Sequence, residues 1–222
     1  MNVKLGLTFI FKDEYWFKKI TLPAICILIP LIGQVVVAGW SLKIAKNVID
    51  GIEEPLPDLD FVEDLKRGFF FLAIQIVYSV PIYLLQSIIV WLSTTLIQNV
   101  SMSIDEMSAL TLFSFIFYGI ILIFFMICAQ IAQMNFITKN DLTAAFKLKE
   151  IWHLFTANPF DWILVYVIGT LLFFILSPLG LLACIIGLFF TITYISAVTS
   201  HLTGQAYLRS VQKGQLSANL PE

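Results

Sequence analysis

Four long stretches of this sequence contain no acidic or basic residue. Asp, Glu, Lys, Arg and His are all absent from residues 20–42, 68–104, 107–138 and 162–200. Each stretch is longer than the roughly 20 apolar residues with which a helix crosses a bilayer. Charged residues make up 13% of the sequence, against about 25% in an average soluble domain. A soluble core is therefore excluded, and the sequence predicts an integral membrane protein.

The motifs that mark common catalytic sites are also absent. The sequence contains no HExxH, GxSxG, GxGxxG or Walker A pattern, which excludes the sites that these motifs build. The cysteines Cys26, Cys128 and Cys184 stand singly within apolar runs, where we expect small buried side chains. A net charge of −2 gives no indication of nucleic-acid binding. We therefore expect no enzyme activity, no metal, no cofactor and no nucleic-acid partner.

The apolar runs predict an all-α bundle that crosses the membrane several times. Residues 69–97 and 104–134 are each expected to form one long helix, and Ser103 with Glu106 fits a capping box before the second. Residues 162–200 are too many for one crossing, and Ser177-Pro178-Leu179-Gly180 is a turn signal near their middle. We expect two antiparallel helices there, 162–176 and 179–203, and about five to six membrane segments in all.

Residues 20–42 admit two interpretations, because Pro23, Pro30 and Gly33 interrupt the helical pattern. The segment is either one kinked span or a re-entrant hairpin that turns between Pro30 and Gly33. With the hairpin, all 13 Lys and Arg residues lie on one side of the membrane, whereas a single span divides them nine to four. Positive residues favour the cytoplasmic side, so the count favours the hairpin, with both termini in the cytoplasm.

Two segments outside the apolar runs are amphipathic. Residues 1–19 and 141–156 carry apolar side chains at helical spacing with lysines between them, a pattern typical of helices that lie in the membrane interface. An acidic segment, residues 50–64, is expected to be a solvated loop. The sequence thus indicates one transmembrane domain over residues 1–210 and a flexible tail over residues 211–222.

The last apolar run carries candidate contact residues. Small residues at four-residue intervals let helix backbones approach closely, and they occur here as Ser196, Ser200 and Gly204, with a shorter series at Ala183 and Gly187. His201 and Gln205 are also four apart and share a helix face. For this pair we expect a structural hydrogen bond rather than a proton relay or a metal site.

Several glutamines lie within the apolar runs, among them Gln75, Gln130 and Gln133. Buried amides in a membrane bundle usually form hydrogen bonds between helices, and we expect this role here. The alternative is that they line a path for a solute.

Short motifs follow one another between Trp16 and Gly68. They are Ile29-Pro30-Leu31-Ile32-Gly33, Gly39-Trp40, the step Gly51-x4-Leu56-Pro57 before Asp58–Phe61, and Lys66-Arg67-Gly68. Near the end of the chain stands His201-Leu-Thr-Gly-Gln205. In these motifs the chain resembles the membrane protein family catalogued as domain of unknown function 4013, although Thr203 stands where that family usually has an aromatic residue. The resemblance implies a prokaryotic multi-spanning membrane protein and no particular activity.

These features predict function through binding rather than catalysis. Spans without ionisable groups suit packing against lipid and partner helices. The first hypothesis is an accessory or structural subunit of the prokaryotic cytoplasmic membrane, whose partners are membrane lipids and other membrane subunits. The alternative is a passive transporter or channel for a small or lipidic solute, since coupled transporters generally keep the intramembrane charges that these runs lack.

Overall fold

The computed structural model describes residues 1–53, 56–100 and 103–218, and all regular structure over these residues is helical. The expected all-α fold is therefore confirmed. In chain order the elements, with 3₁₀ helices marked η, are α1 (Val3–Thr8), η1 (Phe9–Lys12), α2 (Trp16–Cys26), α3 (Ile32–Ile49), α4 (Phe61–Asn99), α5 (Ile104–Lys139), η2 (Leu142–Phe146), α6 (Leu148–Ala157), α7 (Pro159–Leu182) and α8 (Cys184–Ala218).

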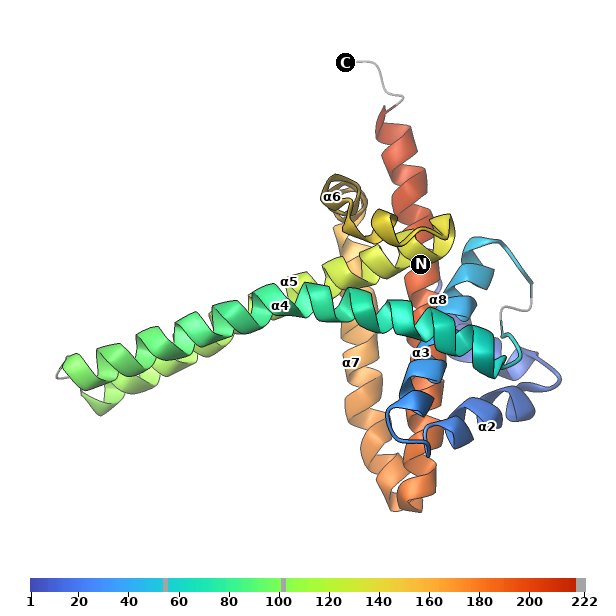
Figure 1. The fold of residues 1–222 in the computed structure, drawn as a ribbon, viewed down its shortest axis with the longest axis horizontal. Coiled ribbons are helices and arrows are strands. Elements are labelled where there is room, and N and C mark those ends of the chain that lie inside the picture. The colour runs from blue at the N-terminus through green and yellow to red at the C-terminus, as the bar shows by residue number, and fades with distance from the viewer. Residues whose placement is uncertain (54–55, 101–102, 219–222) are drawn as a thin grey trace.

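Four of the described helices are long and apolar enough to cross a membrane, namely α4, α5, α7 and the Ile186–Leu216 part of α8. The expected number of membrane segments, five to six, is slightly higher than these four. It is compatible with them, because the shorter helices α2 and α3 also come from an apolar run. The four long helices form two hairpins. The α4–α5 hairpin leaves the body of the molecule and runs across the direction of the α7–α8 hairpin (Figure 1).

The core lies where α3, α8, the first half of α4 and the second half of α5 meet. Trp40 of α3, Ile131 of α5 and Leu202 of α8 are fully buried there. The other half of the α4–α5 hairpin lies outside this core, and its large side chains, such as Trp91 and Phe113, are exposed. We call this half, residues 83–99 of α4 and 104–122 of α5, the arm.

The start of α5 is the one predicted from the sequence. The Ser103 hydroxyl accepts a hydrogen bond from the Glu106 backbone N–H (3.3 Å), and the Glu106 carboxylate accepts one from the Ser103 N–H (2.8 Å). This reciprocal pairing satisfies two donors that the first turn leaves open. The capping box is therefore confirmed.

The turn expected at Ser177-Pro178-Leu179-Gly180 is wrong. The two antiparallel helices are present, but α7 continues through Pro178 to Leu182, and the chain turns near Ala183. Gly180 serves helix contact instead, because a Cβ there would lie only 2.6 Å from the Thr191 hydroxyl of α8. In apolar surroundings a broken helix has no water to satisfy its backbone, so a proline does not suffice to end one.

Residues 20–42 form two helices rather than one kinked span. α2 ends at Cys26 and α3 begins at Ile32. Leu31, between them, has a φ of 63°, in a region that L residues rarely adopt. A Cβ on Gly33 would lie 1.6 Å from the Cys26 carbonyl oxygen, so only glycine lets α3 start against the end of α2. This helix–turn–helix is what the hairpin interpretation requires, with its turn a few residues earlier than expected.

Both amphipathic segments are helical, the first as α1 and η1 and the second as η2 and α6. α1 packs on α8, where a Cβ on Gly6 would lie 2.4 Å from the Leu202 side chain. α8 itself continues to Ala218, so residues 211–218 of the expected tail are helical. The last four residues of that tail lie outside the described part of the chain.

Candidate functional site

α3 and α4 touch backbone to backbone. A Cβ on Gly39 of α3 would lie 1.8 Å from the Asp64 carbonyl oxygen, and a Cβ on Gly68 of α4 would lie 1.8 Å from the Val35 carbonyl oxygen. Ordinary contact begins near 3.4 Å. Any side chain at either glycine would therefore force the helices apart, and we call this contact the α3–α4 junction.

The polar groups around the junction are paired within the chain. The buried Trp40 indole N–H donates to the Pro57 carbonyl oxygen (3.0 Å). Asp64 is fully buried, accepts a hydrogen bond from Arg67 Nη1 (2.9 Å) and lies 3.9 Å from Lys43 Nζ. A buried carboxylate is costly unless it has such partners. The acidic segment, which the sequence predicts to be a solvated loop, thus ends in a buried ion cluster.

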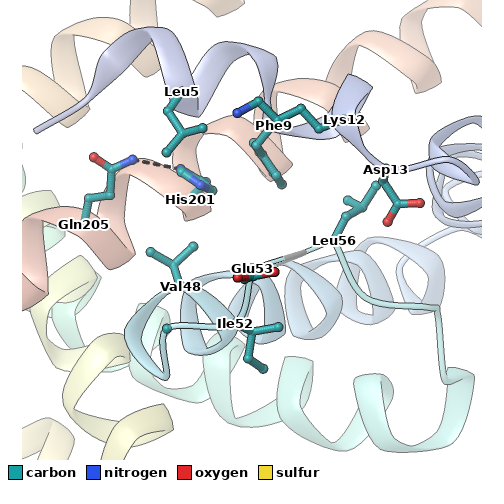
Figure 2. A pocket seen from close by; sticks show the side chains of 11 residues that line it. Leu5, Phe9, Lys12, Asp13, Val48, Ile52, Glu53, Leu56, His201 and Gln205 are labelled. Carbon is teal, nitrogen blue, oxygen red and sulfur yellow. Dashed lines mark hydrogen bonds between the residues drawn. The ribbon is translucent and has the colours of Figure 1, made fainter.

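His201 and Gln205 line a pocket of about 260 Å³ between η1, the end of α3 and α8 (Figure 2). The His201 ring stacks on Phe9 with their centroids 4.3 Å apart. Gln205 Nε2 lies 3.1 Å from His201 Nδ1 and can only donate, so Nδ1 accepts. Gln205 Oε1 accepts from the Asn2 backbone N–H (2.7 Å). The pair thus links the start of the chain to α8. The described residues contain no group of three His, Cys, Asp or Glu side chains that could hold a metal.

The small residues of α8 fall in two different places. A Cβ on Gly204 would lie 2.8 Å from a backbone oxygen of α3 and 3.0 Å from Val48 Cβ, so α8 meets α3 at this glycine. A Cβ on Gly187 would lie 2.7 Å from Ala183 Cβ and close to the end of α7. The shorter series therefore belongs to the turn of the α7–α8 hairpin, whereas Gly204 lies in the body.

A second cavity, of about 240 Å³, lies among five helices, α3, α4, α5, α7 and α8. We call it the amide cavity. Its lining contains no Asp, Glu, Lys, Arg or His. The polar residues that line it are Ser41, Gln75, Gln130, Gln133, Tyr166, Ser196, Thr199, Ser200 and Thr203, and the apolar ones are Leu42, Phe71, Met126 and Met134.

The three glutamines of the amide cavity have unequal partners. Gln133 Nε2 donates to Gln75 Oε1 (3.1 Å), which is the kind of interhelical hydrogen bond that the sequence predicts. Gln75 Nε2 reaches only the Met126 sulfur (3.4 Å), a weak acceptor. Gln130 Oε1 is buried and has no hydrogen-bond partner among the described residues. The cavity thus offers an unused acceptor and a poorly used donor.

Two acids that could serve as a catalytic base, Asp141 and Asp161, each have hydrogen-bond partners of their own. The Asp141 carboxylate accepts hydrogen bonds from the Thr143 hydroxyl and from the Thr143 backbone N–H. These bonds hold the pKa of Asp141 below its ordinary value. Asp161 accepts hydrogen bonds from Asn158 (2.8 Å) and Arg209 (3.3 Å). Each of these acids is thus engaged at the start of its own helix, and the geometry assembles no acid–base pair from them.

A family model described as Protein of unknown function (DUF4013) matches residues 22–185. The chain belongs to this family. The match contains the whole α3–α4 junction, including Gly39-Trp40 and Lys66-Arg67-Gly68, through which the sequence resembles the family. No curated protein and no solved structure matches the chain.

Sequence reasoning missed several residues of the amide cavity. Ser196 and Ser200 are predicted from the sequence, but as helix-contact residues, whereas Thr199 and Thr203 are not predicted. The four stand at positions 196, 199, 200 and 203, spaced as one helix face, and this spacing is a signal that could have found the two threonines. Ser41 of α3 and Tyr166 of α7 carry no such signal. Their place in the lining follows only from how five helices pack.

Proposed function

We propose that this membrane protein is an accessory or structural subunit of a larger membrane assembly and that the arm is its contact with the partner. The observation that carries the proposal is the exposure of the arm. Its large apolar side chains point away from the chain's own core, with Trp91 67% exposed and Phe115 74% exposed. Apart from Asp105 and Glu106 at its tip, the arm has no Asp, Glu, Lys, Arg or His.

The direction of the arm favours a protein partner over lipid alone. The α4–α5 and α7–α8 hairpins run in crossing directions (Figure 1). Both hairpins therefore cannot be parallel to the normal of one flat bilayer. An arm lying flat in the interface would need a strongly polar face, which its sequence does not provide. An arm lying flat in the hydrocarbon would bury the acids of its tip, which is costly. In a bilayer whose normal is parallel to α7–α8, partner helices can cover the apolar side chains of the arm where lipid does not.

Gly119 supports a helix as this partner. It lies in the middle of α5, and a Cβ built on it would meet no atom within 4 Å. A glycine inside a helix costs about 1 kcal/mol relative to alanine, and the chain gains no packing in return. In membranes small residues permit close approach of a second helix. We therefore place a transmembrane helix of another subunit on the Gly119 face of the arm.

Site-specific crosslinking in native membranes tests this role. A photoreactive phenylalanine replaces Phe115, one turn from Gly119, or, as a matched control, the equally exposed Phe174 of α7. We expect one discrete protein adduct from position 115, its loss in the Gly119→Leu background, and no such adduct from position 174. Lipid adducts alone at position 115, or a protein adduct that Gly119→Leu leaves unchanged, would contradict the proposal. An adduct between two copies of this chain would replace the accessory role by self-association.

A second candidate, passive passage of a small solute, is favoured by one observation, the uncharged polar lining of the amide cavity among the membrane helices. Both candidates act through binding. We propose that the protein is not an enzyme, and the engagement of Asp141 and Asp161 with different partners supports this.

A further inference from the structure

We propose that the amide cavity is a binding site for a small, uncharged polyhydroxy compound. This inference goes beyond the subunit role and does not depend on it. It stands on the size of the cavity, on the absence of charge in its lining and on the balance of hydrogen-bond donors and acceptors that the lining presents.

The size of the cavity suits a small organic molecule. Its volume is about 240 Å³, far more than the ~30 Å³ that one water occupies in the liquid. It is also below the roughly 300–1,000 Å³ of pockets for drug-sized ligands. A neighbouring hollow of about 320 Å³ shares Gln130, Tyr166 and Thr199 with it and opens between α5, α7 and α8. The cavity and the hollow thus adjoin at these three residues.

The lining contains no ionisable group apart from the Tyr166 phenol. A charged ligand would therefore lose its hydration without gaining a counter-charge, and an unpaired buried charge is strongly unfavourable. The occupant is accordingly a neutral molecule. This excludes amino acids, phosphates and other ions as the ligand class.

Three of the six hydroxyl groups of the lining present only acceptors. Ser41, Thr199 and Thr203 each donate their hydroxyl hydrogen to a carbonyl oxygen of their own helix, at 2.7, 2.6 and 2.7 Å. Each hydroxyl has one hydrogen and two lone pairs, so what remains faces the cavity as acceptor. Gln130 Oε1 adds a buried acceptor without a partner. A ligand that satisfies this lining must bring several donors.

Alcohol groups are neutral and bring hydrogen-bond donors, so they meet both requirements of the lining. Each alcohol O–H donates to an acceptor of the lining and also accepts from an amide such as Gln75 Nε2, whose present partner is the weakly accepting Met126 sulfur (3.4 Å). The apolar part of the lining, which includes Phe71 and Met126, offers contact to the C–H faces of a polyol. A compound with alternating C–H and O–H groups therefore fits the whole lining.

The test uses the full chain in lipid nanodiscs and radiolabelled glycerol, erythritol and sorbitol as probes. We expect saturable binding of at least one of them. Gln130→Leu removes the unpaired acceptor, and the loss of one to two hydrogen bonds should weaken binding about tenfold. Gln86→Leu makes the same change on the arm, outside the cavity, and should leave binding unchanged. Where Gln130→Leu does not fold, Ser200→Ala removes one lining hydroxyl with little change of volume and should weaken binding several-fold.

Three results would overturn the inference. One is the absence of saturable binding of every polyol by the parent protein. Another is equal binding by the parent, Gln130→Leu and Ser200→Ala, which would locate the polyol elsewhere, for instance beside His201. The third is displacement of the polyol by sodium chloride at constant osmolarity, which would show that the uncharged oxygens of the lining bind a cation instead. None of these results depends on whether the arm crosslinks to a partner.

Discussion

Gly39→Ala tests the α3–α4 junction with the smallest possible change. The new Cβ would lie 1.8 Å from the Asp64 carbonyl oxygen and 2.7 Å from the Gly68 backbone nitrogen. Both neighbours are backbone atoms of a helix, so neither can swing aside as a flexible side chain would. To restore ordinary contact, α3 and α4 must separate by about 1.6 Å, which is a change of helix position rather than of one rotamer.

The expected cost follows from that separation. A gap of roughly 0.5–1 Å already forfeits about a quarter to a half of the dispersion attraction in a contact. Overpacking of a core typically costs about 1–3 kcal/mol, and more where the backbone must move. Alanine recovers about 1 kcal/mol over glycine through helix propensity. We therefore expect Gly39→Ala to lower the free energy of unfolding by about 2 kcal/mol or more.

Gly119→Ala is the matched control, since it is the same substitution in another long helix. A Cβ there would meet no atom within 4 Å, so only the propensity gain remains, and we expect about 0.5–1 kcal/mol of added stability. Unfolding of both variants in mixed micelles, followed by tryptophan fluorescence, measures the difference. A Gly39→Ala variant as stable as the parent would refute the backbone contact between α3 and α4. Loss of stability in Gly119→Ala would show that the arm is not open at that position.

Other substitutions address separate contacts. Gly204→Leu should prevent extraction of monodisperse protein, because a side chain there would press against the α3 backbone 2.8 Å away, and a variant as stable as the parent would refute the contact. Trp40→Phe removes the hydrogen bond to Pro57 (3.0 Å) and should cost about 1–3 kcal/mol in thermal unfolding, since the buried carbonyl loses its donor. Cysteines placed at Asn2 and Gln215 should both resist an impermeant reagent added to intact cells, and labelling of either from outside would contradict cytoplasmic termini.

The sequence predicts the long helices well, because absence of charge is a one-dimensional property. A run without ionisable residues has few alternatives to a helix in a membrane, and α4 and α5 follow from this alone. The start of α5 is equally local, since Ser103 and Glu106 stand within one turn of each other. The sequence pattern misplaces the turn after α7, because proline and glycine are turn signals in water. Gly180 has no side chain, and this allows α8 to pack closely against α7 at that position.

The candidate site could not be predicted to the same extent, because it is assembled from distant segments. The pairing of Gln75 with Gln133 joins residues that are 58 positions apart. Asp64 is buried where α4 packs on α3, with Lys43 and Arg67 as its partners. The sequence does show that polar side chains lie in apolar runs. Which of them share a cavity depends on how the helices pack.

The α3–α4 junction also connects the fold to the proposed role of the arm. The arm is the continuation of α4 and its partner α5, and the direction of α4 is fixed where Gly39 and Gly68 bring its backbone against α3. A side chain at either glycine would therefore change the direction of the arm as well as the stability of the core. Gly39→Ala should for this reason weaken the crosslink from position 115 even in the fraction of protein that remains folded, whereas Gly119→Leu should abolish the crosslink without destabilising the chain. If the crosslink persists in folded Gly39→Ala protein, the junction does not set the direction in which the arm meets its partner.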